Sequence, residues 1–190
     1  MALEGMITTP STGGKSFKVA DVVDIRICLA NSETGGKLAI FEETIPPHHG
    51  VPFHIHKHED EMFHFLEGEY QIWCGNKTYM AYPGDIVFLP KNVPHTFYNH
   101  SSSRGRTLNT YLPGGFDEFI EILSKLPGNT DLTTLGELGD KYGIHYSYYL
   151  PWKHEGPHDG SVERFYDKSE LVKNVRFTNP EALKIFNLID

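Results

Sequence analysis

The stretch HIHKHEDEMFHFLEG, residues 54–68, combines histidines and acidic residues with an alternating apolar pattern. Successive side chains of a β-strand point to opposite faces, so His54 and His56 are expected to point the same way. If the chain turns over residues 57–60 and enters a second strand, the carboxylate of Glu61 lies beside the two imidazoles. The stretch therefore predicts two β-strands that bring candidate metal ligands together.

A third imidazole comes from PGDIVFLPKNVPHTFYN, residues 83–99, where Pro90 and Pro94 restrict the backbone before His95. Three imidazoles and one carboxylate form a mixed nitrogen and oxygen ligand set. Such a set suits one divalent Fe, Mn, Ni, Co, Cu or Zn ion per chain, and a six-coordinate ion would keep positions open for substrate or O₂. The residue types do not choose among these ions.

Other polar residues of the region have a simpler interpretation. The run Glu59–Glu61 has the composition of a solvated turn. Taken singly, five histidines are best explained as polar side chains with ordinary hydrogen-bond partners: His48, His49, His58, His64 and His100. The spacing of the remaining candidates favours a metal site, and we call them the ligand set: His54, His56, Glu61 and His95.

Short strand-like segments run from Val22 to about Leu112, at intervals of roughly ten residues, with turn-forming residues between them. This spacing, without an intervening helical pattern, predicts an antiparallel sandwich or barrel. No internal repeat is visible, so one barrel is expected rather than two. The predicted fold class is therefore all-β over this range.

The apolar period changes after Pro113. One helix face is formed by Phe116, Phe119, Ile120 and Leu123. A weaker helical pattern runs from about residue 133 to residue 142. A last helix is expected in NPEALKIFNLID, residues 179–190, because Asn179 can cap it and Pro180 suits the first helical position.

These residues resemble the two motifs of the cupin superfamily, HxHx(3,4)Ex6G and Gx5PxGx2Hx3N. The first motif is formed by His54, His56, Glu61 and Gly68, and the second by Gly84, Pro90, Asn92, His95 and Asn99. The sequence departs from the pattern at two glycine positions. The first motif opens with a glycine before its first histidine, and here this residue is His48; the middle glycine of the second motif is Asn92. Asn tolerates a positive φ better than other non-glycine residues, so the second turn can still form.

The resemblance implies a cupin-type jelly-roll β-barrel in which the ligand set binds the metal ion. The flanking segments TGGKLAIFEETIPP and YLPGGFDEFIEIL are similar to bacterial single-domain cupins described as quercetinase-like, so the resemblance covers about residues 15–150. We divide the chain into a cupin barrel (1–113), a helical extension packed on the barrel (114–144) and an aromatic-rich tail ending in a short helix (145–190).

Quercetinases, as the resemblance implies, use a divalent ion to bind a deprotonated flavonol and bring O₂ to it. A carboxylate within reach accepts the hydroxyl proton, a role that we assign to Glu61. Aromatic residues are available to line a pocket for a planar substrate: Phe53, Phe63, Phe65, Trp73, Phe88 and Phe97. Taken singly, each is better explained as a core residue, and only the set supports an apolar cavity.

Three functions stay open at this stage. The first is a dioxygenase of quercetinase type, acting on a flavonol or another enolisable aromatic small molecule. The second is a metal-dependent isomerase, cyclase or lyase that works without O₂. The third is a non-catalytic module that binds a small molecule or a metal. A complete ligand set argues against a metal-free module, but fold and ligands alone do not decide the function.

Composition excludes some partners. The formal net charge is −8, with 17 Lys and Arg against 25 Asp and Glu, and no basic stripe is present, so no nucleic-acid partner is expected. No apolar run approaches the ~20 residues of a membrane span, and no secretory leader is visible, so a cytoplasmic protein without membrane contact is expected. Cys28 and Cys74 are expected to be buried thiols.

The tail suggests how the chain associates. Residues 145–190 are rich in aromatic side chains, which disordered segments normally lack. The tail is expected to wrap its own barrel, to close the pocket or to cover a partner subunit. Cupins commonly form dimers, and a partner subunit would cover the apolar face of residues 179–190. We therefore expect a homodimer that binds a small-molecule substrate.

Overall fold

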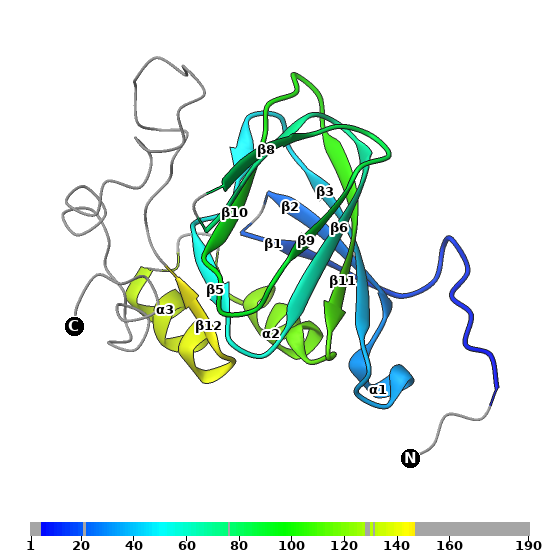
Figure 1. The fold of residues 1–190 in the computed structure, drawn as a ribbon. Coiled ribbons are helices and arrows are strands. Elements are labelled where there is room, and N and C mark those ends of the chain that lie inside the picture. The colour runs from blue at the N-terminus through cyan, green and yellow to red at the C-terminus, as the bar shows by residue number, and fades with distance from the viewer. Residues whose placement is uncertain (1–4, 21, 76, 128–129, 131, 147–190) are drawn as a thin grey trace.

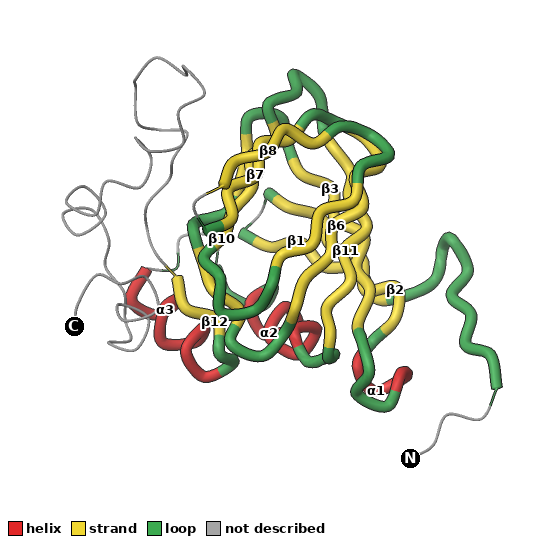
Figure 2. Tube along the Cα trace, viewed as in Figure 1, coloured by secondary structure: helices red, strands yellow, loops and turns green. Residues whose placement is uncertain are grey.

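The computed structural model describes residues 5–20, 22–75, 77–127, 130 and 132–146. Two antiparallel β-sheets face each other, and the helices gather at one end of them (Figures 1 and 2). The first sheet has the strand order β1-β2-β3-β11-β6-β9. The second has the order β12-β5-β10-β7-β8, with β4 paired to β10. The prediction of an antiparallel all-β fold is confirmed.

The bounds of the elements are as follows. The first sheet contains β1 (Lys15–Val19), β2 (Val23–Leu29), β3 (Ala39–Ile45), β6 (Asp60–Glu67), β9 (Ile86–Leu89) and β11 (Gly105–Leu112). The second contains β4 (His49–Gly50), β5 (His54–His56), β7 (Tyr70–Cys74), β8 (Lys77–Ala81), β10 (His95–Asn99) and β12 (Ile144–Tyr146). The helices are α1 (Asn31–Thr34), α2 (Phe116–Leu123) and α3 (Leu132–Lys141).

Side-chain alternation decides which residues point between the sheets. On β6 the buried positions are Glu61, Phe63 and Phe65, and the residues between them are only partly buried. The neighbouring strand β11 matches this pattern, because Tyr111 pairs with Glu61 in the register of the two strands. A slip of one residue would turn these side chains outward, so the apolar pattern fixes the register.

Two buried clusters fill the space between the sheets. One lies towards the helices and joins β2, β3 and β11 to α2 and β12. The other joins β6, β9 and the end of β3 to β7, β8 and β10. Helix α2 contributes Phe116, Phe119 and Ile120 to the first cluster, as its predicted apolar face requires. The strand β12 was not predicted, and it extends the second sheet by pairing with β5.

The two departures from the motif glycines adopt glycine-like backbone conformations. His48 has φ +52° and Asn92 has φ +61°, both in the left-handed region. The turns that the motifs require are therefore made without glycine, and for Asn92 this confirms the prediction. None of the helices within the described residues is long and apolar enough to cross a membrane. The expected helix at 179–190 and the tail from residue 147 lie outside the described residues.

Candidate metal centre

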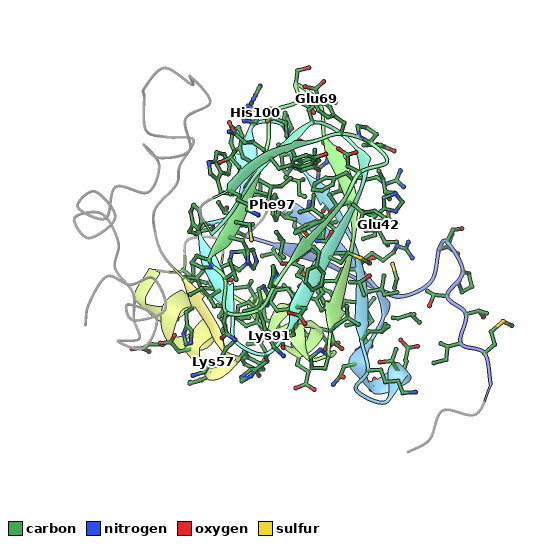
Figure 3. The ribbon with its side chains drawn as sticks, in the orientation of Figure 1. Glu42, Lys57, Glu69, Lys91, Phe97 and His100 are labelled. Atoms are coloured by element: carbon green, nitrogen blue, oxygen red, sulfur yellow. The ribbon has the colours of Figure 1, made fainter. Side chains whose placement is uncertain are left out.

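The ligand set lies between the two sheets. His54 and His56 are on β5, His95 begins β10, and Glu61 is the second residue of β6 in the opposite sheet. Figure 3 labels Lys57, which directly follows β5, at the end of the molecule where the helices gather. The centre therefore lies towards this end, where β5 and β6 are joined by a short turn.

The four predicted ligands come together in one buried group. Their candidate ligand atoms all lie within 4.8 Å of one another. The exposed fractions are 8% for His54, 0% for His56, 2% for Glu61 and 1% for His95. Glu61 Oε2 lies 3.2 Å from His95 Nε2 and 3.8 Å from His56 Nε2. Residues 41 positions apart in sequence thus offer three nitrogens and one oxygen to a single point.

The hydrogen bonding of this group fits a bound cation. Nδ1 of His54 lies 2.9 Å from the Pro52 carbonyl, and Nδ1 of His95 lies 2.9 Å from the Val93 carbonyl. With Nδ1–H donating to a carbonyl, Nε2 carries the lone pair that a metal ion needs. Among the buried atoms without a hydrogen-bond partner in the described residues are three that face one another: His56 Nε2, His95 Nε2 and Glu61 Oε2. A divalent ion would satisfy all three.

The protonation states also suit metal binding. Burial, followed by the neighbouring His95 and His56, lowers the pKa of His54 well below its ordinary value. His54 is therefore neutral near pH 7. Burial alone would raise the pKa of Glu61, but the neighbouring His95, His56 and Tyr111 lower it. Glu61 is therefore an ionised carboxylate, the form that binds a metal ion or accepts a proton.

A cavity of about 90 Å³ opens beside the ligand set. Its polar lining comes from His54, Glu61, Glu43 and Tyr111. Its apolar lining comes from the β1–β2 region, from Tyr146 of β12, and from Phe116, Ile120 and Leu123 of α2. The arrangement presents a small, mostly apolar space to one side of the candidate ion.

The predicted aromatic pocket residues are not gathered around this cavity. Phe97 lines it, whereas Phe88 is 55% exposed and lines a separate surface groove between β8 and β9. The other four are buried, at 0–2% exposure, but do not line it: Phe53, Phe63, Phe65 and Trp73. Phe88 points outward because β9 alternates, with Leu89 buried and Phe88 exposed.

The sequence reasoning missed other residues of the site. Tyr111 faces Glu61 across β6 and β11, and Phe116 packs against the ring of His56 with centroids 4.7 Å apart. Glu43 is 6% exposed, and burial followed by the charge of Glu61 raises its pKa to about 8. The inward positions of β3 provided a signal for Glu43, since Phe41 and Ile45 flank it with period two.

The geometry defines a class of protein, a jelly-roll with a buried centre of three imidazoles and one carboxylate. Residues 41–111 match the family model described as a cupin domain. The matched range includes the whole ligand set. The predicted resemblance is confirmed.

Several solved structures share the fold. KdgF from Halomonas sp. aligns with a TM-score of 0.53 and 12% identity, over 59% of this chain and 99% of that chain. A predicted oxalate decarboxylase from Thermotoga maritima aligns with a TM-score of 0.52 and 18% identity, over 56% of this chain and 99% of that chain. An RmlC-like cupin from Shewanella frigidimarina aligns with a TM-score of 0.52 and 15% identity, over 60% of this chain and 96% of that chain. These likenesses confirm the predicted jelly-roll.

One curated relative is similar in sequence. The chain is 28% identical to quercetin 2,3-dioxygenase of Bacillus subtilis (strain 168) over 98 residues. The match covers 52% of this chain and 29% of that protein. The likeness therefore concerns less than a third of the relative's length.

Proposed function

We propose that this protein is a metal-dependent oxygenase of quercetin 2,3-dioxygenase type, acting on a flavonol or another enolisable aromatic small molecule. The observation that carries the proposal is the buried ligand set beside a mostly apolar cavity. The partial likeness to the Bacillus enzyme supports this reaction class. The identity of the divalent ion is left open by the ligand types, which suit Fe, Mn, Ni, Co, Cu or Zn.

The chain's own residues have defined tasks in this reaction. When bound, a divalent ion supplies Lewis acidity towards an enolate and open positions for O₂. Glu61 accepts the hydroxyl proton of the substrate on a carboxylate oxygen, because its lowered pKa keeps it ionised. Tyr111 donates a hydrogen bond to Glu61 and orients the carboxylate. The apolar wall from α2 excludes water from the reacting atoms.

A second candidate is favoured by the size of the cavity. About 90 Å³ is small beside the roughly 300–1,000 Å³ of typical ligand pockets. Such a space suits a small enolisable carbonyl compound better than a flavonol of three rings. An isomerase, cyclase or lyase that works without O₂ would use the same centre, with Glu61 moving a proton between substrate atoms. A non-catalytic module is the third candidate.

One experiment separates the three. The protein is stripped of metal, reloaded with each candidate ion, and assayed with a panel of flavonols and small enols in the presence and absence of O₂. We expect flavonol turnover with stoichiometric O₂ uptake that stops under anaerobic conditions. Turnover of a small enol without O₂ would instead establish the second candidate. Metal binding without any turnover across the panel would contradict both enzymatic proposals.

A further inference from the structure

A second buried carboxylate lies behind the ligand set. Glu59 belongs to the turn between β5 and β6, and it is 5% exposed, whereas His58 beside it is exposed. We propose that Glu59 is a positioning residue that holds the ring of His56 and strengthens it as a metal ligand. This inference rests on the proposed metal centre and assigns a role to a residue outside the ligand set.

The contact between Glu59 and His56 is specific. Glu59 Oε2 lies 3.5 Å from His56 Nδ1, within ion-pair distance, and neither atom has a hydrogen-bond partner in the described part of the chain. The other ring nitrogen, Nε2, faces Glu61 Oε2 at 3.8 Å. His56 is 0% exposed, so bulk solvent does not reach either nitrogen. The ring therefore lies between two carboxylates, one of them in the ligand set and one outside it.

The other two imidazoles are held differently. Nδ1 of His54 and Nδ1 of His95 each face a backbone carbonyl, which is a neutral acceptor. Only His56 has a carboxylate at this position. A carboxylate attracts the Nδ1–H of an imidazole more strongly than a neutral carbonyl does, and such a partner strengthens the imidazole as a metal ligand. His56 is therefore expected to be the strongest nitrogen donor of the set.

Helix α2 fixes the carboxylate from the other side. A Cβ placed on Gly115 would lie 3.4 Å from Glu59 Oε1, so the carboxylate packs closely against this residue. Gly115 is the N-cap of α2, where the helix dipole favours a negative charge. The first residue of α2, Phe116, contacts the His56 ring edge-on at 4.7 Å. The helix thus holds both partners of the contact.

The test measures metal affinity without turnover. Wild type, Glu59→Gln, Glu59→Asp and Glu59→Ala are titrated with Co²⁺ and with Zn²⁺ in competition with a chromophoric chelator. The matched control is Glu69→Gln, the same change at an exposed residue, which Figure 3 labels at the end of the molecule far from the helices. The visible spectrum of the Co²⁺ protein reports on the ligand field, and the unfolding of the metal-free protein reports on the fold.

We expect Glu59→Gln to bind both ions about 10–100-fold more weakly than wild type, with a changed Co²⁺ spectrum. Glu59→Asp should recover part of the affinity, Glu69→Gln should match wild type, and metal-free Glu59→Gln should unfold like wild type. Equal affinity and equal spectra for wild type and Glu59→Gln would overturn the role of Glu59 while leaving the metal centre in place. Failure of wild type to bind either ion would overturn both proposals.

Discussion

His54 of β5 and His95 of β10 are directly paired across antiparallel strands, and their ring centroids lie 4.5 Å apart. The pairing joins the two motifs, which are separated in sequence by the segment that contains β7 and β8. Both side chains point between the sheets because the register is fixed by buried neighbours such as Phe97, which pairs with Ile72 of β7. The centre is thus built by strand register rather than by a mobile loop.

The first prediction concerns metal binding by the ligand set. Alanine at any one of the four positions leaves an incomplete coordination sphere, so affinity should fall by more than the ~10–100-fold typical of outer contacts. Metal content of the purified variants, measured by elemental analysis, tests this expectation. Full metal occupancy in two or more of these variants would show that the ligand set does not bind the ion.

The controls for that experiment are two neighbouring histidines outside the ligand set. His58 is exposed in the turn after β5, and His64 lies on the outward face of β6. His58→Ala and His64→Ala should therefore retain the metal content of wild type.

The second prediction concerns proton transfer. Glu61→Gln keeps the size of the side chain and one acceptor oxygen but removes the carboxylate. We expect turnover per bound metal ion to fall by about 10²–10⁴-fold, the range usual for loss of a general base. The rate must be normalised to metal content, because Glu61 also belongs to the ligand set. A metal-loaded Gln variant with full activity would place proton transfer on another group, such as Glu43 in the same cavity.

Much of the fold and the ligand set could be predicted because short-range rules decide them. Period-two alternation placed Glu61, Phe63 and Phe65 on one face of β6, and their burial confirms it. The left-handed conformation of Asn92 followed from the tolerance of asparagine for positive φ. Each of these features depends on the local backbone, and the motif spacing then links the strands.

The rest depends on tertiary contacts. Strand β9 reads IVFL, so its composition does not say which alternate residues face inward, and Phe88 proved to be exposed. Glu59 sits in a charged turn that looks solvated, yet it is buried against Gly115, 56 positions later in the sequence. Glu59 is buried because the start of α2 packs against it, and the sequence around Glu59 does not indicate this contact.

The third prediction concerns the tail, which the described residues do not include beyond residue 146. The segment 179–190 is apolar enough to need a covering surface, and we expect a partner subunit to provide it. Deleting 179–190 should lower the melting temperature or shift the dimer towards monomer, while metal content stays that of wild type. Light scattering and thermal unfolding measure these effects. Unchanged mass, melting temperature and turnover would show that the segment is an appendage.

The fourth prediction concerns the pH dependence of stability through Glu43. Burial, followed by the charge of Glu61, raises the pKa of this carboxyl from 4.5 to about 8. The folded state therefore holds the proton more tightly than the unfolded state. The resulting stabilisation is fully present below about pH 4.5 and is lost as the pH rises through about 8.

Glu43→Gln isolates this effect, because an amide stays neutral at every pH. In metal-free protein, the variant should gain stability relative to wild type between about pH 5 and about pH 9, by at most about 5 kcal/mol. Urea unfolding of both proteins at the two pH values measures the difference in their free energies of unfolding. Titrating groups that behave alike in the two proteins do not contribute to this difference. The matched control is Glu42→Gln, since Glu42 lies on the outer face of β3 and pairs with Arg26 at 2.7 Å. A relative stability of Glu43→Gln that does not change with pH would show that Glu43 is ionised in the folded protein throughout this range.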